Sequence, residues 1–215
     1  MKKLIAINGG PRKDWNTDIL LNKVMEGAVA AGAQAEMVHL YDLNFKGCVS
    51  CFACKRKGGA HGVCAYKDEL SPVLSALHDA DAMVFGAPIY LGNVTAEMRA
   101  FLERFIFSNM LYNAERAQFL PPNKKAAFVY TMNVPEDRFI AVGYPNALSY
   151  AEGAIERVVG NIELLHSFDT LQFSDYSQYE ANNFDPIAKK QRHDTVFPED
   201  CEKAFALGQR LVAQE

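Results

Sequence analysis

Short apolar runs alternate with segments of helical periodicity along nearly the whole chain. Apolar runs at 4–7 and 82–87, together with the strand-like segments 35–40, 126–132 and 164–173, predict five strands. Apolar residues spaced three and four apart, such as Leu70, Val73, Leu74 and Leu77, predict helices between the strands. These helices cover 18–31, 68–78, a segment that begins after the capping residue Thr95, about 146–159 and about 198–213. Strand and helix therefore alternate five times.

This alternation predicts one α/β domain over residues 1–215, built on a doubly wound, mostly parallel five-stranded sheet. The run at 82–87 is typical of a central strand that is buried on both faces. Three segments fall outside the pattern, namely a cysteine-rich loop at 41–67 and extra segments at 107–124 and 174–195. Such sheets bind ligands beyond the carboxyl ends of their strands, so we expect the site at loops 9–17, 88–94 and 133–144.

The composition narrows the classes of partner. The 215 residues carry a formal net charge of −4, which gives no electrostatic reason to expect nucleic acid or an anionic membrane as a partner. No apolar run approaches the length of a membrane span, and the first residues lead directly into a strand and not a signal peptide. We therefore expect a cytoplasmic protein.

The first predicted strand-to-helix loop has the features of an anion site. It reads Ile-Asn-Gly-Gly-Pro-Arg-Lys-Asp-Trp-Asn-Thr from Ile7 to Thr17. Gly10 allows close approach of the backbone, Arg12 can pair with phosphate oxygens, and a helix N-terminus favours negative charge. The loop matches neither a Walker loop nor the dinucleotide fingerprint G-x-G-x-x-G, which favours a monophosphate. An ordinary strand-to-helix turn capped by Thr17 is the alternative.

Four of the five cysteines lie within seventeen residues. Cys48, Cys51 and Cys54 have the spacing C-x2-C-x2-C, and Cys64 follows after nine residues. Four thiolates can hold an iron–sulfur cluster. The pairs Cys51-x2-Cys54 and His61-x2-Cys64 also have the spacing of zinc ligands, and structural or free thiols are the third alternative.

Three stretches carry a resemblance to a known family. They are Gly-Gly-Pro-Arg-Lys-Asp-Trp-Asn-Thr, Gly-Cys-x-x-Cys-x-x-Cys, and Ala-Pro-Ile-Tyr-Leu-Gly-Asn-Val-Thr-Ala-Glu-Met-Arg-Ala-Phe-Leu-Glu-Arg. With them, and with a weaker match in the late Lys189…Arg192-His193…Phe197-Pro198-Glu199-Asp200 stretch, the chain resembles the NAD(P)H-dependent FMN reductases of the flavodoxin-like superfamily, and especially the branch of iron–sulfur flavoproteins. The resemblance implies a three-layer α-β-α sandwich whose five parallel strands have the order 2-1-3-4-5.

The resemblance also implies which residues hold a cofactor. FMN phosphate would lie on Gly10, Arg12, Asn16 and Thr17. The flavin ring would lie between two walls, one formed by Pro88, Ile89, Tyr90, Leu91, Gly92 and Asn93 and the other by Thr131, Met132 and Asn133. An apolar wall with nearby backbone N–H groups suits a flavin ring.

Two positions depart from the family's usual pattern. Gly10 replaces a serine, which removes one hydrogen bond to phosphate, a net effect of about 1 kcal/mol. Trp15 replaces a glycine. The family's [4Fe–4S] cysteines correspond to Cys48, Cys51, Cys54 and Cys64, although the gap before the fourth is typically shorter, and many relatives keep the first three without a cluster.

The resemblance implies an enzyme that takes hydride from NADH or NADPH onto FMN and passes electrons to a quinone, a flavin or a protein acceptor. It names no catalytic acid or base, because the flavin is the reactive group. One alternative is a [4Fe–4S] flavoprotein that accepts electrons singly from ferredoxin. Another is a non-enzymatic flavodoxin-type carrier or redox sensor. The family also implies a homo-dimer or homo-tetramer, for which the aromatic residues Tyr112, Phe119, Tyr176, Tyr179 and Phe184 offer either interface or core packing.

Overall fold

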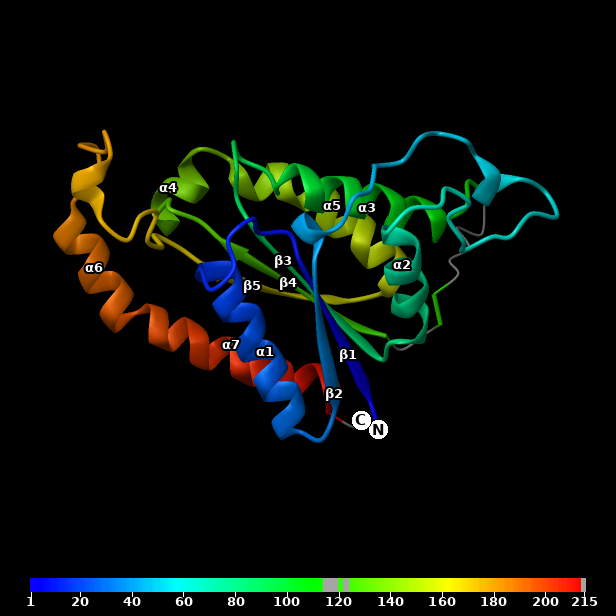
Figure 1. Cartoon of the computed structure of the whole chain (residues 1–215), viewed down its shortest axis with the longest axis horizontal. Helices are drawn as coiled ribbons and strands as arrows, with labels where there is room; N and C mark the ends of the chain where they lie inside the picture. The colour runs from blue at the N-terminus through cyan, green and yellow to red at the C-terminus, as the bar shows by residue number, and fades with distance from the viewer. Residues whose placement is uncertain (114–119, 122–123, 214–215) are drawn as a thin grey trace.

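The computed structural model describes residues 1–113, 120–121 and 124–213. These residues form a five-stranded parallel sheet in the order β2-β1-β3-β4-β5, with helices on both faces (Figure 1). The strands are β1 (Lys3–Asn8), β2 (Gln34–His39), β3 (Ala82–Pro88), β4 (Lys125–Thr131) and β5 (Ile162–Ser167). The fold class and the strand order predicted from the sequence are confirmed.

The helices alternate with the strands as expected. They are α1 (Asn16–Ala30), α2 (Leu70–Asp79), α3 (Ala96–Ser108), α4 (Glu136–Ala141), α5 (Tyr144–Val159), α6 (Pro186–Thr195) and α7 (Phe197–Val212). Short 3-10 turns lie at Leu40–Asp42, Ala53–Lys55 and Tyr176–Gln178. Thr95 caps α3 as predicted, because its hydroxyl accepts a hydrogen bond from the Met98 N–H. Within the described ranges, no helix is long and apolar enough to cross a membrane.

The sheet separates two hydrophobic cores. Along β1, Ile5 and Ile7 pack with side chains of α2, α3 and α5, whereas Leu4 and Ala6 face α1 and α7. Residues 82–87 of β3 are buried on both faces, as their continuous apolar run predicted. This alternation fixes the register of the sheet, because a shift by one residue would exchange the two sets.

Glycine brings α1 and α7 into close contact where they cross. A Cβ atom on Gly208 would lie 1.9 Å from the carbonyl oxygen of Val24, and one on Gly27 would lie 1.9 Å from the carbonyl oxygen of Phe205. Side chains at either position would therefore separate the helices. This crossing holds α7 against the sheet and so anchors the C-terminal part of the chain.

Three segments differ from the sequence-based expectations. The last strand ends at Ser167 and not at 173, since Asp169 has a left-handed backbone (φ 51°) and the Thr170 N–H bonds to the Met132 carbonyl. The expected loop 133–144 contains α4, and the extra segment 174–195 contains α6. In the latter, the Asp185 carboxylate caps the N–H groups of Ile187 and Ala188.

The aromatic residues of the extra segments pack against one another. Tyr112 meets Phe107 edge-on, Tyr179 stacks on Phe173, and Tyr176 contacts Phe173 and Phe184. Tyr112 and Tyr179 still expose more than half of their surface. Phe119 lies outside the described residues, so the structure does not distinguish the two roles expected of this set.

Candidate functional site

The carboxyl ends of the strands surround a cleft of about 390 Å³. It lies between the β1–α1 loop, the turn after β3, the end of β4 and the segment after β5. The lining residues are Gly10, Pro11, Arg12, Trp15, Asn16, Thr17, Pro88, Ile89, Tyr90, Leu91, Thr131, Met132, Asn133, Thr170, Leu171 and Gln172. This is the edge of the sheet at which parallel α/β folds bind ligands.

The β1–α1 loop is held by its own buried polar groups. Asn8, the last residue of β1, is fully buried, and its side-chain oxygen Oδ1 accepts from the Gly10 N–H at 2.8 Å. Its amide donates to Asp18 Oδ1 at 2.8 Å, and Asp18 Oδ2 accepts from the Asp14 N–H at 2.9 Å. Asp14 has a left-handed backbone (φ 55°) that this contact stabilises. The loop therefore keeps its shape without a ligand.

The first turn of α1 opens into the cleft. Trp15 precedes the helix but makes no capping hydrogen bond within the described part of the chain. The first N–H groups of a helix have no acceptor inside the helix, so they remain available at its positive end. The Thr17 hydroxyl lies 2.7 Å from that of Thr131, which joins α1 to the end of β4. This end of the cleft suits an anion.

Side chains of α1 and its loop also hold the segment after β5. The guanidinium of Arg12 donates to the Gln172 carbonyl at 2.9 Å and lies over the Trp15 ring at 4.4 Å. Partial burial lowers the pKa of Arg12, although nearby Tyr90 and Tyr179 oppose this shift. The Asn16 amide donates to the Leu171 carbonyl at 2.8 Å. Residues far apart in sequence thus close one wall of the cleft.

The turn after β3 forms the apolar wall. The Ile89 N–H bonds to the Thr131 carbonyl at 2.9 Å, and Tyr90 and Asn93 exchange two backbone hydrogen bonds across the turn. Leu91 is fully exposed at the tip and has a left-handed backbone (φ 52°). Gly92 (φ 81°) completes the turn, where a side chain would meet the ring of Tyr144 at 3.2 Å.

The four clustered cysteines line a second, smaller pocket, away from the cleft. Cys48, Cys51, Cys54 and Cys64 share it with Arg104, Phe107 and neighbouring backbone. Ser50 and Phe52 both have left-handed backbones (φ 53° and 55°), so the loop coils tightly between the first three cysteines. In the described ranges, however, no three His, Cys, Asp or Glu side chains converge closely enough to hold a metal ion.

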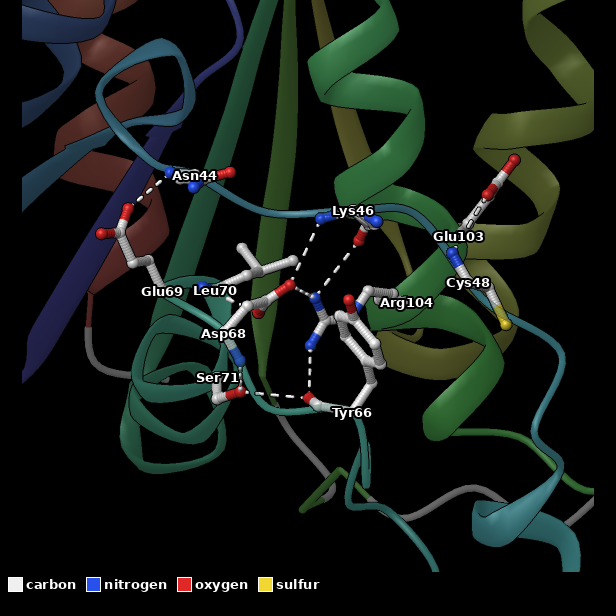
Figure 2. A network of polar contacts seen from close by, with 10 residues as sticks. All are labelled: Asn44, Lys46, Cys48, Tyr66, Asp68, Glu69, Leu70, Ser71, Glu103 and Arg104. Atoms are coloured by element: carbon white, nitrogen blue, oxygen red, sulfur yellow. Dashed lines mark hydrogen bonds and ion pairs between the residues drawn. The ribbon is translucent and has the colours of Figure 1, made fainter.

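A buried ion pair secures this cysteine loop to α3 (Figure 2). Arg104 is 1% exposed; its Nη1 lies 2.5 Å from Asp68 Oδ2 and 3.2 Å from the Lys46 carbonyl. Its Nη2 donates to the Tyr66 carbonyl at 2.8 Å. Burial opposes the charge, but hydrogen bonds to Asp68 and Cys64 raise the pKa of Arg104 above its ordinary value. Both ends of the cysteine segment are therefore fixed by one side chain.

Comparison with known proteins places the chain in a family. The sequence model of the NADPH-dependent FMN reductases matches residues 2–134, which hold β1 to β4 and most of the cleft. The chain belongs to this family. An iron–sulfur flavoprotein of Archaeoglobus fulgidus is 40% identical over 108 residues, which are 50% of this chain and 51% of that protein. The chain spans about half the length of the curated relatives that it matches.

Solved structures of this FMN reductase fold resemble the whole chain. The NAD(P)H:quinone oxidoreductase of Methanothermobacter marburgensis has a TM-score of 0.74 at 15% identity and covers 98% of both chains. An FMN-dependent NADH-azoreductase of Bacillus anthracis, solved in complex with FMN, has a TM-score of 0.64 at 14% identity and covers 97% of this chain and all of that one. At such low identity these structures establish the fold alone.

The cleft brings together nearly all of the predicted cofactor residues of this FMN reductase family member. Gly92 and Asn93 are the exceptions: they shape the turn but do not line the cleft. Sequence reasoning missed Thr170, Leu171 and Gln172, because it extended the last strand through them. A signal was present, since the polar pair Asp169 and Thr170 interrupts the predicted strand 164–173.

Proposed function

We propose that this chain binds FMN in the cleft and transfers electrons from NADH or NADPH to a quinone, a free flavin or a protein acceptor. The shape of the cleft carries the proposal. An anion site at the start of α1 and an apolar wall at Pro88–Leu91 line one cavity. A flavin mononucleotide has a phosphate at one end and a flat apolar ring at the other, so it matches both.

The phosphate end of FMN fits the residues around α1. Gly10 has no side chain to block it, and a Cβ there would already crowd Asn8 Oδ1 at 3.1 Å. The first-turn N–H groups and the hydroxyl of Thr17 supply donors, and Arg12 supplies a positive charge. We propose that Trp15, with the Arg12 guanidinium on its ring, covers this end from solvent.

The ring end fits the apolar part of the lining. Pro88 and Ile89 present apolar surface, and Met132 and Asn133 continue the lining beside them, where the Ile89 N–H bonds to the Thr131 carbonyl. When bound, the flavin accepts hydride from the nicotinamide and releases electrons to the acceptor. The chain positions the ring, excludes water from one of its faces and donates hydrogen bonds to its edge. We assign no catalytic acid or base, because the flavin supplies the chemistry and the chain positions it.

Steady-state oxidation of NADH and NADPH by the FMN-loaded protein, with a quinone and with ferricyanide as acceptors, tests this proposal. We expect turnover with at least one pyridine nucleotide, and its loss on removal of FMN. An FMN-loaded protein that oxidises neither nucleotide would favour the alternative of a non-enzymatic electron carrier.

The cysteine pocket supports a second candidate function, that of an iron–sulfur flavoprotein. Four cysteines are the donor set that a [4Fe–4S] cluster uses, and the relatives of matching sequence carry that name. Among the described residues these side chains do not converge on one point, so a cluster would require the loop to rearrange around it. Anaerobic purification followed by iron and sulfide analysis tests it, and iron-free protein from iron-replete cells would exclude it.

The two sites lie at opposite ends of α3. Thr95, at the N-terminus of α3, donates to the Gly9 carbonyl beside the cleft, whereas Phe107 near its C-terminus lines the cysteine pocket. Twelve steps of helix along α3 correspond to about 18 Å between these two residues. We propose a homo-dimer or homo-tetramer in which one chain's cysteine pocket approaches another chain's cleft.

A further inference from the structure

A buried lysine supports the cleft from behind. Lys189 belongs to α6, outside the part of the chain that the family model matches, and only 5% of its surface is exposed. Its ammonium donates to the Asn133 carbonyl at 2.8 Å, to the side-chain oxygen of Asn133 and to Asp169 Oδ1. The ring of Phe184 covers it at 5.4 Å. A buried charge is costly unless it is paired, so these contacts explain why the ammonium is tolerated there.

The three contacts use all three N–H bonds of the ammonium. Lys189 therefore has no proton left to donate to a ligand. Any effect of Lys189 on a ligand must pass through the residues that it binds. Of these, Asn133 lines the cleft and can contact the ligand itself.

The ammonium also decides which way the Asn133 amide points. Because a lysine only donates, the amide must turn its oxygen toward Lys189 and keep its NH2 group on the other side. Because Asn133 lines the cleft, an amide held in this orientation can offer its NH2 group to a ligand there. Without Lys189, the amide could rotate and present its oxygen to the cleft instead.

Asp169 brings the segment after β5 into the same cluster. Its N–H bonds to the Val134 carbonyl, and the next N–H, of Thr170, bonds to the Met132 carbonyl. The Lys189–Asp169 pair thus ties α6 to two cleft walls. The two charges are unequally screened, since 6% of the lysine side chain is exposed but 34% of the aspartate side chain.

We infer that Lys189 is a positioning residue that sets the reduction potential of the bound flavin, through the Asn133 amide and the charge balance with Asp169. This inference rests on the proposed FMN site. Hydride transfer converts NADH and FMN into NAD⁺ and an FMN hydroquinone anion, so the flavin gains one negative charge and two electrons. A positive charge and an N–H donor behind the ring stabilise that form, whereas a carboxylate destabilises it.

The test compares Lys189→Met with Asp169→Asn in full-length, FMN-loaded protein. Both substitutions break the same ion pair, but we expect them to move the midpoint potential of the flavin in opposite directions, downward for K189M and upward for D169N. The K189M shift should be the larger, because the lysine is less screened by solvent. A tenfold change in the ratio of dissociation constants of oxidised and reduced FMN corresponds to about 30 mV for this two-electron couple.

The double variant K189M/D169N should return the potential toward that of the unaltered protein. Lys190→Met and Asp194→Asn are matched controls, since they break an exposed ion pair one residue away on the same helix and should leave the potential unchanged. If K189M does not fold, D169N must still raise the potential.

Shifts in the same direction, or no shift in either single variant, would overturn this inference and reduce Lys189 to a structural role. Absence of FMN binding by the unaltered protein is a different result, because it would overturn the proposed function and this inference with it.

Discussion

The hydroxyl groups of Thr17 and Thr131 lie 2.7 Å apart, although 114 residues separate them in sequence. Thr17 belongs to the first turn of α1, and Thr131 is the last residue of β4. Both are almost fully buried. Their contact joins the anion end of the cleft to the end of β4, which lies beside the apolar turn and is bonded to it through the Ile89 N–H, so it holds the two parts of the site together.

Thr131→Val should weaken FMN binding and modestly destabilise the fold. Valine has the same shape but cannot form the hydrogen bond, and it leaves the buried Thr17 hydroxyl without that partner. Such a loss costs about 1–3 kcal/mol, which sets an upper limit of roughly five- to hundredfold on the rise in the FMN dissociation constant. Fluorescence titration with FMN measures it. Thr195→Val, at an exposed hydroxyl in α6, is the control, and equal effects of both variants would refute the role of the pair.

Gly208→Ala should destabilise the protein through the crossing of α1 and α7. The new methyl group would meet the Val24 carbonyl, so the helices must move apart at a cost of at least about 1–3 kcal/mol. Gly153→Ala is a matched control in α5, where a Cβ has open space. Because alanine favours helix, that change should stabilise by about 0.5–1 kcal/mol. Urea denaturation should therefore move in opposite directions for the two variants.

Arg104→Met should release the cysteine loop. It leaves Asp68 without its buried partner and removes the Arg104 hydrogen bonds to the carbonyls of Lys46 and Tyr66 (Figure 2). Breaking a buried ion pair costs about 3–5 kcal/mol. Limited proteolysis should cut within 41–67 faster, and iron content should fall if the pocket holds a cluster. Arg99→Met breaks only an exposed pair with Glu103 and should change stability by less than about 1 kcal/mol. An unaltered cleavage rate in R104M would count against this account.

The stability of the protein should fall as the pH drops through the range of histidine titration. Burial lowers the pKa of His166 and of His78 below the ordinary value of 6.5. The unfolded chain then binds more protons than the folded one near and below pH 6.5, so unfolding becomes easier on acidification. His166→Phe should keep the stack with Tyr130 and Phe168 and flatten this dependence, while His78 retains part of it. A pH profile as steep as that of the unaltered protein would contradict the prediction.

The sheet was predictable from the sequence because its signals are local. A run such as 82–87 has to be buried on both faces, and helical periodicity brackets it on either side, so neighbouring elements agree. The Gly10–Thr17 loop and the Pro88–Leu91 turn were also predictable, since each follows a strand directly. Two local signals for the start of a helix were present but not used. Pro135 precedes α4, whose first residue is the acidic Glu136, and Asp185 precedes α6, whose first residue is Pro186.

The rest of the site depends on contacts between distant segments. Leu171 and Gln172 reach the cleft because Asn16 and Arg12 donate hydrogen bonds to their backbone carbonyl groups. Every residue has such a carbonyl, so the sequence of side chains does not predict which ones are bound. Lys189 lies in a polar helix, where an isolated lysine is normally expected to face solvent. Lys189 is buried because its ammonium binds Asn133 and Asp169. The hydrophobic periodicity of the chain does not predict these contacts between distant segments.

Calorimetric titration of the apoprotein with FMN and with riboflavin tests the central claim most directly. Riboflavin has the same ring but lacks the phosphate, so it should use the apolar wall and lose the charge-assisted hydrogen bonds at α1. We expect one FMN per chain and at least about hundredfold weaker binding of riboflavin, since each such bond contributes about 1.5–3 kcal/mol. Equal affinity for the two flavins, or no binding of FMN, would contradict the assignment of this cleft.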